Sequence, residues 1–353
     1  MSARFLLLAA ACWTVAGQQK TFIGAAACDS CHPAEFHAQK NTVHARSLYR
    51  AAGHPLAASF SATQLRRGNF EFEVVRAGSE LHVKANDGLH LMELPLEWAF
   101  GAGEQAVTFV TRVSSEHYLE HSFSYYTDSH SFDITPRHDS LPSRTLNEAM
   151  GQAIRTQSSR ASMISCFGCH STGPVNVSPA GEVRITATGV QCESCHGPGS
   201  AHRAAALQGR PANALITNPG TLSAGELNRL CGRCHRTGAE SPPLDWNSPW
   251  SVRHQPPFLG RSRCFQESTS GLSCVGCHNP HEPLIRNDGA HYRAVCVKCH
   301  HAGQHPPADV CRNQENTDCV RCHMPVVAIG IHVKFTNHWI GVYRADNALR
   351  PHR

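Results

Sequence analysis

The string Cys-x-x-Cys-His occurs seven times in this chain of 353 residues, and we number the copies motifs 1 to 7 in chain order. It is the attachment signature of a c-type haem, in which both thiols form thioether bonds to the porphyrin and the adjoining imidazole coordinates the iron. A shuffled chain of the same composition would contain the string only about 0.06 times, so the sequence predicts seven covalently bound haems c. The thiol pairs are Cys28/Cys31, Cys166/Cys169, Cys192/Cys195, Cys231/Cys234, Cys274/Cys277, Cys296/Cys299 and Cys319/Cys322. The proximal histidines are His32, His170, His196, His235, His278, His300 and His323.

Two other interpretations of these cysteines fit less well. A structural zinc site needs four Cys or His ligands, so each motif would have to recruit a fourth from elsewhere, and a zinc ribbon has no need of a histidine beside the second cysteine. Disulfides or a thioredoxin-type redox pair would explain the cysteine spacing but not seven histidines at the same position. Haem attachment accounts for all three residues of every motif.

The first seventeen residues are typical of a secretory signal peptide. Arg4 precedes an apolar run at residues 5–13, and residues 15–17 are small enough for cleavage. The alanines before Cys12 loosely resemble a lipobox, but Leu is usual three residues before the cysteine, so a lipid anchor is the weaker alternative. No apolar run approaches the roughly 18 residues of a membrane span. We therefore expect an exported protein, periplasmic or extracellular, without a transmembrane span.

Fourteen of the seventeen cysteines belong to the motifs. Since Cys12 lies in the signal segment, the mature chain keeps two others, Cys264 and Cys311. These two could form a disulfide in an oxidising compartment, but the sequence does not tell whether they approach within bonding distance. Two buried free thiols are the alternative, and both interpretations stay open.

The formal net charge of +5 at first suggests a nucleic acid or an anionic membrane as partner. Two propionates on each haem add roughly fourteen negative charges and the ferric cores add about seven positive ones, which leaves the oxidised protein at about −2. No nucleic-acid partner is therefore expected. Because aromatic residues make up only 7% of the chain, we expect porphyrin to supply much of the core.

The motifs are unevenly spaced, and the spacing divides the chain. We predict a signal peptide at residues 1–17, an N-terminal segment with haem 1 at residues 18–66, a β-rich insert at residues 67–140 and a multihaem domain with haems 2–7 at residues 141–353. The expected fold class is mainly α with extensive coil, organised around stacked c-type haems, with a small antiparallel β insert near residues 67–139.

Local patterns support these segments. Short runs of β-branched and aromatic residues between turn residues predict the sheet of the insert, as at residues 70–75 and 106–110. Residues 144–162 carry apolar side chains at helical spacing and predict a helix that leads into motif 2. Beyond Cys166 the chain is rich in Gly, Pro, Asn and Ser, which break regular elements. There we expect short helices that carry or follow the motifs, joined by long coil.

The second axial ligand of each iron is expected to be another histidine. Twenty-five histidines include the seven of the motifs, which leaves eighteen, whereas methionine is scarce and Met324 adjoins a proximal histidine. Bis-histidine ligation implies a lower potential than His/Met ligation. A histidine that closely follows one motif is too near to wrap round its own haem, so it would cap an adjacent haem. The candidate distal ligands are His44, His202, His281, His338, His305, His332 and His138.

Several motifs with their flanks resemble the multihaem cytochromes of the c-552/c-554 type. The resemblance implies periplasmic electron transfer by closely stacked haems, in parallel and perpendicular pairs, and implies that His44, His202 and His338 serve as distal ligands. Seven haems exceed the four of the simplest members, so the ligand map is not copied as a whole. The similar passages are residues 28–33 with His44, residues 192–199 with His202, residues 274–281, and residues 319–325 with His332 and residues 337–340.

These observations favour an exported electron carrier, whose partners are membrane or periplasmic redox proteins, over an enzyme. Some c-552/c-554 relatives act on nitrite, hydroxylamine or tetrathionate, and certain of them mark the catalytic haem with Lys in place of the motif histidine. No Cys-x-x-Cys-Lys occurs here, which weakens the enzymatic alternative without excluding an open-coordinated haem. A subunit of an oligomer or extracellular haem filament is the third alternative.

Overall fold

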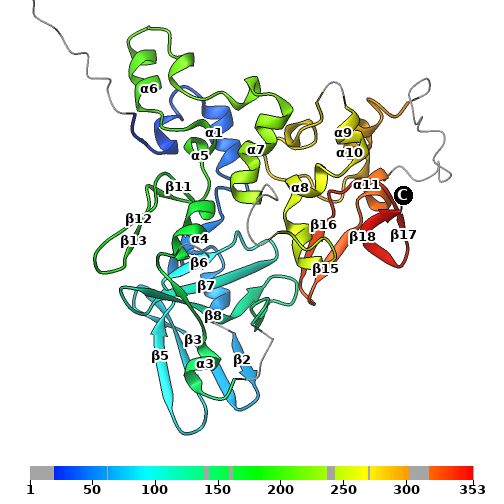
Figure 1. Cartoon of the computed structure of the whole chain (residues 1–353). Helices are drawn as coiled ribbons and strands as arrows, with labels where there is room; N and C mark the ends of the chain where they lie inside the picture. Colours follow the sequence, from blue (N-terminus) through cyan, green and yellow to red (C-terminus); the bar gives the residue numbers. More distant parts are fainter. Residues whose placement is uncertain are drawn as a thin grey trace, which may run out of the picture.

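The computed structural model describes residues 20–61, 63–138, 143–158, 162–236, 243–268, 271–301 and 318–352. Two antiparallel sheets form its N-terminal half, and short helices, coil and two-stranded pairs form the rest (Figure 1). Helix makes up 31% and strand 27%. The expected mainly α fold is therefore wrong, because strands pair at several places outside the predicted insert.

The larger sheet has the strand order β1-β6-β7-β8-β10, with β9 paired to β8, and the smaller has the order β2-β3-β4-β5. We call strands β1 to β10 together the two-sheet unit. The larger sheet contains β1 (Leu48–Arg50), β6 (Trp98–Phe100), β7 (Ala106–Arg112), β8 (His117–Tyr126), β9 (Ser131–Ile134) and β10 (Gly151–Arg155). The smaller sheet contains β2 (Gln64–Arg67), β3 (Phe70–Ala77), β4 (Glu80–Asn86) and β5 (Leu91–Pro95).

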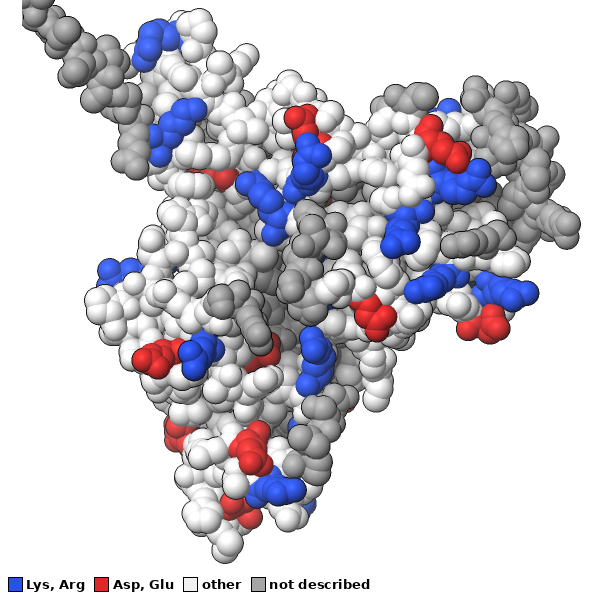
Figure 2. Space-filling view, in the orientation of Figure 1, with Lys and Arg blue, Asp and Glu red and all other residues white. Residues whose placement is uncertain are grey.

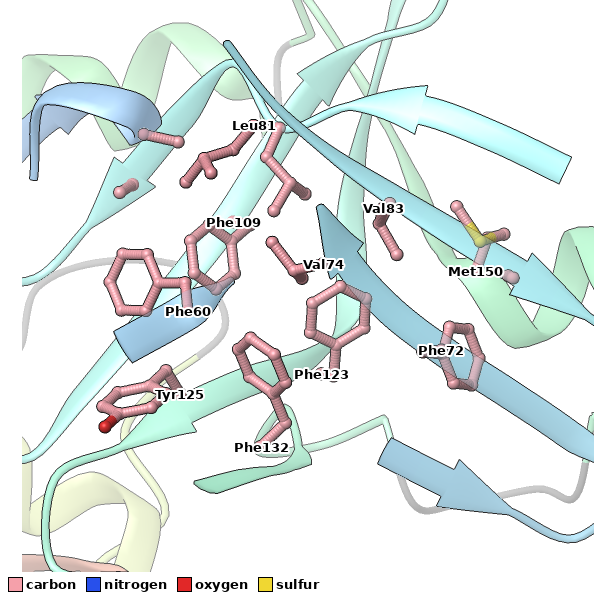
Figure 3. Close-up of a cluster of buried hydrophobic side chains, with 14 of the residues drawn as sticks. Phe60, Phe72, Val74, Leu81, Val83, Phe109, Phe123, Tyr125, Phe132 and Met150 are labelled. Carbon is pink, nitrogen blue, oxygen red and sulfur yellow. The ribbon is translucent and has the colours of Figure 1, made fainter. Parts of the chain in front are cut away.

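The core of this unit lies between its two sheets (Figure 3). Alternate residues of β3 point inward, so Phe72 and Val74 are buried while their neighbours in the strand are more exposed. They meet Phe109 and Phe123 of the larger sheet, both fully buried. This apolar core needs no haem, so the two-sheet unit forms a protein scaffold beside the motifs.

The helix predicted over residues 144–162 is helical only at residues 146–150, and a strand follows it. Helix α3 (Leu146–Met150) ends at Gly151, where β10 begins and pairs antiparallel with β8. Gly151 has φ 151, and a Cβ there would lie 2.1 Å from the carbonyl oxygen of Glu120. Only glycine permits this close backbone approach, so strand pairing overrides the helical spacing.

The motif-rich part consists of short helices, and several begin at polar caps. Ser223 and Glu226 form a capping box at the start of α7, and the Asp288 and Asp318 side chains accept from backbone N–H groups at α10 and α11. The α-helices outside the two-sheet unit are α1 (Pro33–Gln39), α2 (Ala57–Phe60), α4 (Met163–His170), α5 (Cys192–His196), α6 (Ser200–Leu207), α7 (Ala224–His235), α8 (Gln255–Leu259), α9 (Arg263–Glu267), α10 (Gly289–Cys296) and α11 (Cys319–His323). The 3₁₀ turns are η1 (Ala25–Ala27), η2 (Ala51–Gly53), η3 (Asn213–Leu215), η4 (Pro219–Thr221), η5 (Pro249–Arg253) and η6 (Cys274–Gly276).

Four two-stranded pairs complete the fold. The C-terminal pair β15-β16 packs against η5 through a small apolar cluster that includes Val252 and Val327. The paired strands are β11 (Ser171–Thr172) with β14 (Ala187–Thr188), β12 (Asn176–Val177) with β13 (Val183–Arg184), β15 (Val326–Ile329) with β16 (Val333–Thr336), and β17 (Val342–Arg344) with β18 (Asn347–His352).

Candidate haem sites

Every motif forms one helical turn. Motifs 2, 3, 4 and 7 lie in α4, α5, α7 and α11. In the other three, the histidine N–H donates to the carbonyl of the first cysteine, over 2.9 Å for His32 and His278 and 3.0 Å for His300. Residues three apart in a helical turn share a face, so the two thiols of a motif lie together. Two-point attachment to one porphyrin edge needs this arrangement.

Hydrogen bonds fix the orientation of many of the histidine rings. A backbone carbonyl can only accept, so a ring nitrogen bonded to it must carry the proton, which leaves the other nitrogen free to bind a metal. Four proximal histidines and two candidate distal ones use Nδ1 in this way. The pairs are His170 with Ser47 O at 3.2 Å, His196 with Thr217 O at 3.0 Å, His235 with Gln255 Oε1 at 2.9 Å, His323 with Gly341 O at 2.9 Å, His202 with Ala212 O at 3.1 Å and His338 with Thr336 O at 2.9 Å.

These acceptors did not emerge from the sequence. Five of the six are backbone carbonyls, which any residue type supplies, so no side-chain pattern could have revealed them. Gln255 is the exception, but it lies twenty residues beyond His235 with no motif around it. Only the folded chain brings them to the rings.

Four proximal histidines face a second imidazole that comes from another part of the chain. Each pair joins a motif to a candidate distal ligand. The ring centres are 6.4 Å apart for His32 and His202, 6.0 Å for His235 and His44, 6.0 Å for His196 and His281, and 6.3 Å for His278 and His338.

This separation fits a metal ion held between two imidazoles. A metal–nitrogen bond of about 2 Å on each side, with roughly 1.2 Å from each nitrogen to its ring centre, places the ring centres about 6.4 Å apart. Direct stacking of two rings brings their centres closer, as for Tyr126 and His332 at 4.2 Å. The four pairs therefore fit an axially ligated haem iron.

The electrostatics around two of the distal candidates, His338 and His44, favour the neutral form of the ring. Burial, with a smaller contribution from the neighbouring imidazole of His278, lowers the pKa of His338 to about 4. Burial, followed by the nearby His235, likewise lowers the pKa of His44. A neutral imidazole is the form that ligates a metal, because a protonated ring has no free lone pair. The surroundings of His338 and His44 therefore favour the form that can bind a metal.

Thiols of different motifs lie next to one another. Side-chain hydrogen bonds link motif 1 to motif 3, motif 2 to motif 4, motif 4 to motif 5, and motif 6 to motif 7. The linked residues are Cys28 with Cys192, Cys169 with Cys234, Cys231 with Cys274, and Cys296 with Cys319. The motifs are distant in sequence, so the fold gathers the attachment points.

The polypeptide does not cover all the predicted attachment residues. In five motifs the second cysteine is exposed, whereas the first cysteine of every motif is at least partly covered. A thiol must be accessible to react with a porphyrin vinyl group, so exposure is compatible with attachment, which stays a prediction. The exposed cysteines are Cys31, Cys195, Cys234, Cys299 and Cys322.

The proximal histidine of motif 2 has a different neighbour. The His170 ring contacts the edge of Phe100, with ring centres 5.2 Å apart, on strand β6 of the two-sheet unit. Within the described ranges, none of its ring contacts involves a second imidazole. This site therefore differs from the four with facing histidines.

Three other candidate distal ligands are placed differently or fall outside the structure. Both ring nitrogens of His332 are bonded to carboxylates, Nδ1 to Asp128 at 2.9 Å and Nε2 to Asp133 at 3.1 Å. His138 is bonded through Nε2 to Glu120 at 3.0 Å. Ligation by His332 would require at least one of these bonds to break. His305 lies outside the described residues.

Of the two cysteines beyond the motifs, the structure describes Cys264. Burial raises the pKa of Cys264, whose thiol also interacts electrostatically with the motif thiols Cys277 and Cys299. Cys311 and the predicted signal peptide lie outside the described residues. The disulfide between Cys264 and Cys311 and the alternative of two free thiols therefore both stay open.

The surface carries no concentration of one charge on the face seen in Figure 2, where basic and acidic side chains are scattered among uncharged ones. In the part of the chain that the structure describes, no helix is both long and apolar enough to cross a membrane.

The gathered thiols, oriented imidazoles and helical motifs define a multihaem c-type cytochrome. The family model "Cytochrome c554 and c-prime" matches residues 122–197, which include motifs 2 and 3. The family model thus agrees with the c-552/c-554 resemblance over residues 122–197.

Two known proteins are similar over longer stretches. The chain is 25% identical over 150 residues to the multiheme cytochrome MtrA of Shewanella baltica, and the match covers 38% of this chain and 42% of MtrA. It therefore spans less than half the length of that relative. The crystal structure of the outer cell wall cytochrome OcwA has a TM-score of 0.51 at 14% identity, over 90% of this chain and 79% of that one. The likeness to OcwA concerns the fold.

Proposed function

We propose that this chain binds seven haems c and conducts single electrons through them outside the cytoplasm. The observation that carries the proposal is the set of thiol contacts between motifs. Since each thiol is an attachment point, contact between thiols of two motifs brings the attached edges of two porphyrins together. Bound haem supplies the redox step, the gain or loss of one electron by iron. The protein supplies spacing, ligation and burial.

We assign distal ligands on the same basis. His202 would serve motif 1, His44 motif 4, His281 motif 3 and His338 motif 5, because these rings face the corresponding proximal histidines at 6.0–6.4 Å. In each case the distal histidine follows a motif other than the one it serves. Ligation would then tie the motifs together, which compensates for the scarcity of regular structure beyond motif 2.

The contacts also suggest an order of transfer. Thiol contacts join motif 1 to 3, 2 to 4, 4 to 5 and 6 to 7, while His281 after motif 5 reaches motif 3. Cys296 of motif 6 also interacts electrostatically with Cys277 of motif 5. All seven motifs are thus connected, with motif 2, joined to motif 4, and motif 7, joined to motif 6, at opposite ends. We propose that electrons enter near one of these ends and leave near the other.

The proposed location is periplasmic or extracellular. Three observations support export: the predicted signal peptide, the similarity to MtrA, and the fold shared with OcwA, which is an outer cell wall cytochrome. Membrane or periplasmic redox proteins are the proposed partners. Assembly into an oligomer or filament is an alternative that a strictly monomeric holo-protein would contradict.

A second candidate function rests on motif 2. Because the His170 ring contacts Phe100 and not an imidazole among the described residues, its iron could keep an open position for a small nitrogen or sulfur compound. This would make the protein a reductase, with the other haems supplying electrons to that site, or an oxidase, with the other haems accepting electrons from it. An acid–base group near that position would also be required.

Electron paramagnetic resonance of the oxidised holo-protein tests both proposals. The four facing pairs predict at least four low-spin bis-histidine haems, and fewer would contradict the ligand assignment. A high-spin signal that changes when nitrite or cyanide is added would favour the second candidate. If every haem is low-spin and inert to these ligands, the enzymatic candidate fails.

A further inference from the structure

Two buried hydrogen-bond donors near motif 4 have no acceptor among the described residues. They are the indole Nε1 of Trp250 and the Nε of Arg253, both in the η5 turn and both out of contact with solvent. Buried donors in native proteins are nearly always paired, and an unpaired one signals strain or a missing partner. Two such donors three residues apart point to one missing acceptor.

Positive charge gathers around the same indole. The guanidinium carbon of Arg253 lies 4.1 Å from the Trp250 ring centre, and that of Arg137 lies 6.0 Å from it. Burial, and then repulsion by Arg236 and Arg137, lowers the pKa of Arg253 to about 10. In the described part of the chain no carboxylate forms an ion pair with Arg137 or Arg253. The cluster therefore has an excess of positive charge.

The backbone at the cluster is strained. Arg137 has φ 75 and Arg236 has φ 62, in the left-handed region that residues other than glycine rarely occupy. Such conformations persist only where the surrounding structure imposes them, and they are concentrated at binding and active sites. Arg137 follows β9 of the two-sheet unit, while Arg236 directly follows proximal His235. Two separate parts of the fold thus contribute arginines to one place.

We infer that Trp250 and Arg253, with Arg137 beside them, form a binding site for a carboxylate or small oxyanion. An anion there would accept from both unpaired donors and offset the excess charge. The nearest source is a propionate of the haem at motif 4, because Arg253 lies two residues before Gln255, which holds the His235 ring. A free oxyanion such as sulfate or nitrite is the other source. The propionate source rests on the proposed function, whereas the site itself does not.

The test compares holo-proteins in which haem loading is first verified by mass. In redox titrations, Arg253→Gln should move one haem to lower potential, because a nearby positive charge stabilises the reduced iron. A tenfold or larger loss in its reduction equilibrium constant is expected, which is 59 mV for one electron. Trp250→Phe should shift the same haem by less, and Arg253→Lys should restore most of the potential. Arg263→Gln is the matched control, since that arginine is exposed and pairs with Glu267 of its own helix α9.

Sulfate and nitrite, added at constant ionic strength, distinguish the two sources. A propionate already in the site predicts no saturable response in the wild type. A saturable shift in the wild type that Arg253→Gln abolishes assigns the site to a free oxyanion. If Arg253→Gln and Trp250→Phe match Arg263→Gln in every potential and in both titrations, no anion binds there and the inference is overturned. If the measured mass shows that the holo-protein carries fewer than seven haems, that result counts against the proposed seven-haem function and not against the anion site.

Discussion

Replacement of His338 by alanine tests the ligand assignment at a single iron. The ring of His338 faces that of His278 at 6.3 Å, is buried, and is aimed by the bond from its Nδ1 to Thr336 O at 2.9 Å. Alanine removes the ring and leaves a cavity beside the iron. One haem in seven should therefore change from low-spin to high-spin, while the others keep their spectra.

The magnitude follows from the geometry. The observed 6.3 Å is close to the roughly 6.4 Å expected for two imidazoles on one metal, so the full axial bond should be lost. Paramagnetic resonance of the oxidised variant should show about one seventh of the iron as high-spin. Free imidazole should enter the cavity and restore the low-spin signal.

His332→Ala provides the matched control, because that histidine lies in the same C-terminal segment but is bonded to two carboxylates. It should leave all spin states unchanged. The ligand assignment is refuted if His338→Ala keeps the wild-type low-spin count, or if both variants lose the same signal.

Two further predictions concern the two-sheet unit. Burial lowers the pKa of His332, but its bonds to Asp128 and Asp133 outweigh this and raise it. The stabilisation is therefore complete below the unfolded-state pKa of about 6.5 and is lost as pH rises through the folded-state pKa. His332→Gln should cost about 1 kcal/mol in urea unfolding at pH 6 and clearly less at pH 9. Gly151→Ala should cost about 3 kcal/mol, because its Cβ would meet the Glu120 carbonyl oxygen at 2.1 Å.

Each of these has its own control. Gly78→Ala has a left-handed φ of 62 but nothing within 4 Å of the new Cβ, so it should cost only about 1 kcal/mol; an equal loss in both glycine variants would contradict the proposed close approach. For His332→Gln, a loss of unfolding free energy that is the same at pH 6 and pH 9 would show that the charge of His332 does not stabilise its contacts with Asp128 and Asp133.

Haem attachment is predicted from sequence alone because each motif is a local pattern. Two cysteines, one histidine and their spacing fit in one helical turn, as at Cys28 to His32, so no tertiary information is needed. How far each thiol is covered is not local, and the exposure of Cys31 and Cys322 could not be foreseen. The choice of His44, His202, His281 and His338 as distal candidates used their places after the motifs. Which ring faces which depends on the fold.

The strand content was underestimated for a related reason. Strand β10 has apolar residues at helical spacing, and only its pairing with β8, which Gly151 permits, makes it a strand. Trp250 and Arg253 belong to no motif and sit in a five-residue 3₁₀ turn, so nothing local marked them. Tertiary packing determines both the strand β10 and the site at Trp250 and Arg253. A pattern along the sequence carries no information about that packing.

The most direct test of the whole account is the intact mass of the purified protein, expressed where c-type haems mature and measured under denaturing conditions that remove unattached haem. Covalent attachment at every motif predicts the polypeptide mass plus seven haems, with a red product. A colourless protein, or a mass that carries fewer than seven haems when maturation is complete, would contradict it.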